Sequence, residues 1–134
     1  MAQSRIARAQ LTVQPLEPLI AKVTGGAEVR VDRVTLEIPR LADNGHAVPL
    51  RISVSSPMTE RDFVRTIHVL SERNPRPLMA VFHLNPHCGR AEISTRVRLN
   101  GSQRVVVIAG VSDGSWWSGS AQVEVTETAC LDAT

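Results

Sequence analysis

The stretch that decides the fold is residues 91–109, AEISTRVRLNGSQRVVVIA. From Ala91 to Leu99, inward-facing positions alternate with charged or polar ones. This period of two is typical of a β-strand with one buried face. The dipeptide Asn100-Gly101 is a strong turn signal, and the apolar run at 104–109 predicts a further strand after it.

The same alternation recurs on both sides of this stretch, with Gly, Pro, Asn or Asp residues between the runs. About seven short strands separated by turn signals predict an all-β, antiparallel β-sandwich with charged outer faces. The other expected strands are at 34–38, 50–54, 63–70, 78–84 and 117–126.

One segment departs from the period of two. In residues 15–23, PLEPLIAKV, the apolar side chains recur at helical spacing, and Gly25-Gly26 follows. This pattern predicts a short amphipathic helix before the first strand. We therefore expect a flexible lead-in at 1–12, a sandwich domain with its N-terminal helix at 13–126, and a tail at 127–134.

The composition limits the classes of function. The 134 residues suffice for one domain, and the net charge of +2 comes from basic residues interleaved with acidic ones. Nucleic-acid binding would call for a concentrated basic face, so we expect none. No apolar run has the length of a membrane span, and no membrane association is expected. Motifs that cradle phosphates, and HExxH or CxxC pairs, are missing from the sequence, and no cofactor is expected.

The candidate functional residue is Cys130, which follows the last expected strand and has only Leu131 to Thr134 after it. A thiol on a short tail is hard to bury, because terminal residues are poorly ordered unless something holds them. A mobile thiol suits a group carrier, which presents one covalently held fragment to several enzymes.

Other histidine, cysteine and tryptophan residues leave alternatives open. His83, His87 and Cys88 form a possible zinc site, to which His46 and His68 could contribute. A disulfide between Cys88 and Cys130 is a second possibility. Otherwise His83 is expected to be half-buried on a strand, with Cys88 shielded in a turn packed against strands. Trp116 and Trp117 are expected to provide one core ring and one surface ring, the latter for partner contact.

Six segments, in a fixed order over residues 23–130, resemble the SoxY family of thiosulfate-oxidation carrier proteins. They are ADNGHAVPL (42–50), SSPMTERDFVRTIHV (55–69), ERNPRP (72–77), FHL (82–84), GRAEISTRVRL (89–99) and VSDGSWWS (111–118).

This resemblance implies an immunoglobulin-like sandwich in the bacterial periplasm, paired with a second sandwich, SoxZ. It also implies that the carrier itself performs no catalysis. A haem enzyme would attach the sulfur substrate to the tail cysteine by oxidative coupling, and a hydrolase would release the product. Cys130 is the position that matches the family's carrier cysteine. The family tail is usually Gly-Gly-Cys-Gly-Gly, whereas here it reads Thr128-Ala129-Cys130-Leu131-Asp132.

The leading hypothesis is therefore a covalent sulfur carrier with Cys130 as the attachment point. The alternative is a non-catalytic interaction module, a sandwich whose edge docks a partner while Cys130 is inert or disulfide-bonded. Association with a SoxZ-like sandwich, or with a second copy of the chain, is expected in either case because open sandwiches leave strand edges.

Overall fold

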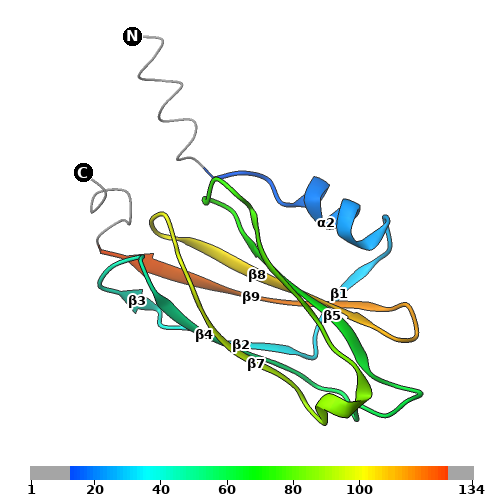
Figure 1. Cartoon of the computed structure of the whole chain (residues 1–134). Coiled ribbons are helices and arrows are strands. Elements are labelled where there is room, and N and C mark those ends of the chain that lie inside the picture. Colours follow the sequence, from blue (N-terminus) through cyan, green and yellow to red (C-terminus); the bar gives the residue numbers. More distant parts are fainter. Residues whose placement is uncertain (1–12, 127–134) are drawn as a thin grey trace.

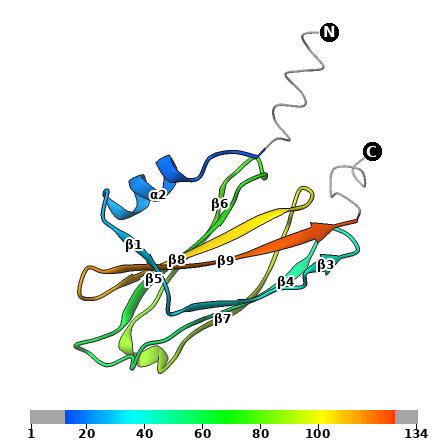
Figure 2. The ribbon, with the colours of Figure 1, turned by 180° about the vertical axis from the view of Figure 1, so that it is seen from behind.

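The computed structural model describes residues 13–126, which form two β-sheets packed face to face with one helix outside them (Figures 1 and 2). The elements are α2 (Glu17–Thr24), β1 (Val29–Val31), β2 (Val34–Glu37), β3 (Leu41–Ala42), β4 (Val48–Val54), β5 (Val64–Ser71), β6 (Leu78–His83), the 3₁₀-helix η1 (Pro86–Cys88), β7 (Ala91–Val97), β8 (Gln103–Val111) and β9 (Trp116–Val125).

The larger sheet has six strands, in the order β1-β9-β8-β5-β6, with β3 also paired to β9. The smaller sheet has the order β2-β4-β7. All pairs are antiparallel except β1 with β9 and β3 with β9, which are parallel. The predicted all-β sandwich is confirmed. The strands in residues 13–126 number nine rather than about seven, because β1 and β3 are too short to show a period.

The helix forms where the apolar spacing predicts it. Pro18 lies in its first turn, where its missing N–H would have no intrahelical acceptor. Gly25 ends it in the left-handed conformation, at φ 71°. The helix lies on the outer face of the larger sheet, where buried Leu16 packs with Leu70 and Ile108. Within residues 13–126, no helix has the length and hydropathy to cross a membrane.

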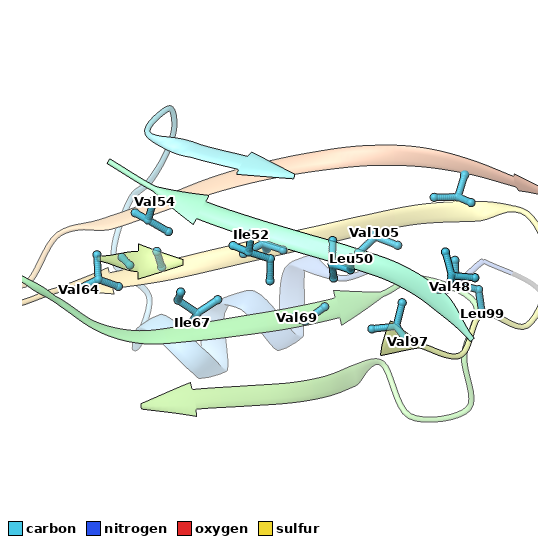
Figure 3. Close-up of a cluster of buried hydrophobic side chains, with 14 of the residues drawn as sticks. Val48, Leu50, Ile52, Val54, Val64, Ile67, Val69, Val97, Leu99 and Val105 are labelled. Atoms are coloured by element: carbon cyan, nitrogen blue, oxygen red, sulfur yellow. The ribbon is translucent and has the colours of Figure 1, made fainter. Parts of the chain in front are cut away.

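The main core lies between the two sheets. In β4, Val48, Leu50, Ile52 and Val54 are buried while most residues between them are exposed. Their side chains face those of β5 and β8, as Figure 3 shows for Ile67 and its neighbours. Burial of one such side chain contributes about 1.5–3 kcal/mol, so this cluster dominates the stability of the sandwich.

The chain passes from the larger sheet to the smaller one at Arg33, between β1 and β2. Arg33 has φ 66°, and its Nε and Nη2 donate to the Ser55 carbonyl at 2.9 and 2.7 Å. Directly after this kink, the two sheets approach closely. A Cβ at Gly119 of β9 would lie 2.6 Å from the Val34 carbonyl oxygen, so only glycine fits there without displacing backbone.

A buried polar cluster holds the β5–β6 hairpin against the β7–β8 hairpin. The Asn74 side chain donates to the Arg98 carbonyl at 2.6 Å and accepts from the Asn100 N–H at 2.9 Å. Gln103 Nε2 donates to Asn74 Oδ1 at 3.1 Å, and Ser71 Oγ donates to Gln103 Oε1. Because buried polar groups are costly unless paired, this cluster fixes the two hairpins relative to each other.

Candidate functional site

The chain leaves the sandwich at the end of β9, and two short contacts hold that point. The Thr126 N–H donates to the Ala42 carbonyl at 3.0 Å, and Thr126 Oγ1 donates to the Asp43 carbonyl at 2.8 Å. These contacts continue the parallel pairing of β3 with β9. The residue before the tail is therefore held by backbone groups from a segment more than eighty positions away.

Ser102 holds the same point from the other side. The Val125 N–H donates to Ser102 Oγ at 2.8 Å, and Ser102 lies in the loop of the β7–β8 hairpin, which Asn74 braces. Sequence reasoning missed both anchors. A two-residue strand has no detectable period, and nothing in the sequence marks Ser102 as a partner of β9.

Cys130, the predicted attachment residue, and the whole predicted tail at 127–134 lie outside the described residues. What the structure provides is the base of that tail. The base is anchored on two sides, through Thr126 and through Val125.

The second cysteine differs from expectation. Cys88 lies on η1, which Asn85 caps by accepting from the His87 N–H at 2.8 Å. Its thiol is free and exposed, so the prediction of a shielded Cys88 is wrong. The connection from β6 to β7 exposes both His87 and Cys88 instead of packing them on the strands. The disulfide hypothesis involves Cys130, which lies outside the described residues.

The zinc hypothesis finds no supporting geometry in the described part of the chain. His83 and His87 are exposed, whereas His83 was expected to be half-buried. β6 is an edge strand, which explains this difference. Across residues 13–126, no three His, Cys, Asp or Glu side chains are grouped so that they could share a metal ion.

Both tryptophans are half-buried, so the expected division into a core ring and a surface ring is wrong. Trp117 lies between two guanidinium groups, with Arg30 at 5.6 Å and Arg33 at 4.9 Å from its ring centroid. Its Nε1 donates to Ser115 Oγ at 2.8 Å. These contacts stabilise the turn between β8 and β9 and the sheet-switching kink.

Trp116 lies on the outer face of the larger sheet, beside His68. The two rings are 6.0 Å apart at their centroids. Burial lowers the pKa of His68, and the nearby charge of His83 lowers it further, while a backbone hydrogen bond with Ile108 partly opposes them. Within residues 13–126, His68 Nδ1 is buried and has no hydrogen-bond partner.

Acidification is therefore expected to destabilise the fold through His68. Its pKa is lower in the folded state than in the unfolded chain, so the unfolded chain binds more protons as pH falls through about 6.5. Urea unfolding of the wild type should give a lower unfolding free energy at pH 5.5 than at pH 7.5. This difference should be smaller in His68→Gln. His87→Gln, on the exposed η1, serves as the control. An equal pH dependence in wild type and His68→Gln would contradict this assignment.

The comparisons with known proteins agree with this architecture. The family model of sulfur oxidation protein SoxY matches residues 20–130. The comparison with curated proteins finds no match. Among solved structures, the sulfur carrier protein SoxY from Chlorobium limicola f thiosulfatophilum has a TM-score of 0.70 at 24% identity, covering 82% of this chain and 90% of that chain.

Superoxide reductases have similar folds. The neelaredoxin of Ignicoccus hospitalis has a TM-score of 0.63 at 16% identity, covering 70% of this chain and 80% of that one. A putative superoxide reductase from Thermotoga maritima has a TM-score of 0.56 at 20% identity, covering 75% and 89%. At these identities the likeness shows a shared fold alone. The family match is of a different kind, because it runs from helix α2 through β9 to residue 130, and the chain belongs to the SoxY family of sulfur oxidation proteins.

Proposed function

We propose that this protein is a covalent sulfur carrier that holds sulfur intermediates on Cys130. The observation that carries the proposal is the extent of the family match, which continues past the last strand and reaches residue 130. The anchored base at Thr126 is consistent with this role, because a carrier arm needs a defined point from which to move.

The chemistry at Cys130 is the formation and cleavage of bonds to sulfur. The thiol and thiosulfate join through a new S–S bond. The thiol loses its proton to solvent, and a haem enzyme accepts the two electrons. Hydrolysis of the terminal sulfonate by a second enzyme then releases sulfate and two protons, and a persulfide anion stays on Cys130. The carrier supplies a thiol and recognition surfaces, and the enzymes supply catalysis.

The tail of this chain favours a particular set of enzymes. A glycine-rich arm is thin and flexible, whereas Leu131 and Asp132 place bulk and a negative charge next to the thiol. An enzyme that accepts this arm needs a wider channel than one that accepts only glycines. The carrier thus serves enzymes adapted to its own tail.

The carrier works in the periplasm as a pair with a SoxZ-like sandwich. An open sandwich leaves strand edges that a partner sandwich can cover, which supports such pairing. Light scattering after size exclusion, alone and with a co-expressed partner sandwich, measures it. A monomer under both conditions would count against the pairing.

The alternative is an interaction module whose cysteine carries nothing. Intact-mass measurement of the protein from its own host separates the two functions. A carrier should show adducts that disappear on treatment with a reductant, because a bond between two sulfur atoms is reducible. A protein with the same mass before and after reduction would favour the interaction module.

A further inference from the structure

One side of the sandwich is open. Among residues 13–126, strands β6 and β7 end their sheets, and each pairs with only one neighbour, β5 and β4 respectively. At the opposite edge, β9 is covered by β1 and β3, and β2 packs against it at Gly119. The unpaired backbone groups of the two longest free edges therefore face the same side of the molecule.

Between these two edges lies a groove of about 600 Å³. Its apolar surface comes from Leu78, Met79 and Ala80 of β6 and Val97 of β7. Asn74 and Asn100, from the braced hairpins, line one end of it. The groove is therefore apolar at its base and bounded by strand edges, which suits an extended peptide segment.

The groove is also strongly basic. Arg76, Arg96 and Arg98 line it and are exposed, and none of its lining residues is acidic. No ion pair joins any of the three to a carboxylate within residues 13–126. Arg51 of the neighbouring strand β4 differs from them, because it pairs with both Glu37 and Glu92.

This charge pattern selects the occupant. A second copy of the chain, docked through the same side, would bring three more arginines against these three. An acidic segment would instead form charge-assisted hydrogen bonds with the guanidinium groups. Its apolar side chains would cover the base of the groove, and its backbone could pair with an unpaired edge.

The groove lies next to the base of the tail. Asn100 lines it, and two positions further Ser102 bonds the Val125 N–H. Figures 1 and 2 both show the β7–β8 hairpin beside the end of β9. Cys130 is four residues beyond Thr126, so its Cα can lie no more than about 14 Å from the Cα of Thr126. A protein seated in the groove would have Cys130 within reach.

We propose that the groove between β6 and β7 docks an extended, acidic segment of an enzyme that acts on Cys130. This inference rests on the proposed carrier function and adds the surface that recruits the enzyme. The arginines steer the enzyme to the end of the sandwich where the thiol is presented, and the apolar base and strand edges hold it there.

The test measures how fast Cys130 gains a thiosulfate adduct when the purified full chain is mixed with periplasmic extract of its host and thiosulfate. Arg96→Glu/Arg98→Glu should slow adduct formation about tenfold or more, since two attractive contacts become repulsive. The matched control is Arg61→Glu/Arg90→Glu, which changes net charge equally outside the groove. Both double variants should react with iodoacetamide, a neutral reagent, as fast as wild type.

A second measurement uses a defined probe, a seven-residue peptide of alternating Glu and Val, followed by NMR. It should shift the amide signals of β6 and β7 in wild type and in the control, and not in Arg96→Glu/Arg98→Glu. A peptide of alternating Lys and Val should not bind.

The outcomes separate the two proposals. Equal adduct rates in wild type and Arg96→Glu/Arg98→Glu, or an equal slowing in both double variants, would overturn the docking groove and leave the carrier function standing. If the wild type gains no adduct, the carrier function is overturned. The proposal that an enzyme occupies the groove is then overturned as well. Peptide binding without any effect on adduct formation would likewise exclude the enzyme as the occupant.

Discussion

Cys130→Ser is expected to abolish the reducible sulfur adduct completely, whereas Cys88→Ser should leave it in place. A serine hydroxyl cannot form the S–S bond that holds the substrate, so the loss should be total rather than partial. Cys88 is exposed, but it lies on η1, in the connection from β6 to β7. The base of the tail is at the other end of β7, about 20 Å away along that strand.

The exposure of Cys88 makes this comparison informative. Because Cys88 is open to small reagents, alkylation alone does not identify the carrier, and wild type should label at Cys88. Intact mass and peptide mapping of the two variants, isolated from the host with and without reductant, locate the adduct. An adduct that survives Cys130→Ser and disappears in Cys88→Ser would contradict the assignment of the carrier residue.

Gly119→Val should have the largest effect on stability. Even a single Cβ at this position would lie 2.6 Å from the Val34 carbonyl oxygen and 3.1 Å from Leu36 Cδ1. The first contact is with backbone, which cannot rotate away, so β2 must shift off β9. We expect a loss of about 3 kcal/mol or more of unfolding free energy, at the upper end for overpacked interiors.

The neighbouring position gives the matched control. Ser120 is the next residue of β9 and is exposed, so Ser120→Val should change the unfolding free energy by less than about 0.5 kcal/mol. Urea denaturation followed by circular dichroism measures both variants. Equal midpoints for the two would show that the sheets do not approach as closely at Gly119 as described.

The strands with a clear period could be predicted from the sequence. The alternation from Ala91 to Leu99 and the turn at Asn100-Gly101 correspond to β7, its hairpin and β8. Strands β1 and β3, of three and two residues, could not be predicted. They are strands because they pair with β9, and their local sequence shows no strand pattern. The positive φ of Arg33 could not be predicted either, because arginine rarely adopts this conformation and nothing in the sequence marks it.

The functional surfaces were less accessible to sequence reasoning. The position of Cys130 in the chain suggested a carrier, and the family match includes it. The groove gave no such signal, since Arg96 and Arg98 look like ordinary outward-facing residues of an alternating strand. They become a binding surface only because β7 is an edge and β6 lies opposite. Whether a strand lies at the edge of a sheet depends on the topology, which the local sequence does not show. For the same reason the exposure of His83, on edge strand β6, and of Cys88, between the edge strands β6 and β7, was misjudged.

The parallel pairing of β3 with the last residues of β9 has a mechanical consequence. In the proposed carrier, an enzyme that draws residues 127–134 into its channel would pull along β9 and load the hydrogen bonds to β3 and β8 together, in shear. A strand loaded in this way does not unzip one bond at a time. Such a pull should therefore stop at Thr126 without loosening the sandwich, and the working length of the arm would stay constant from one enzyme to the next.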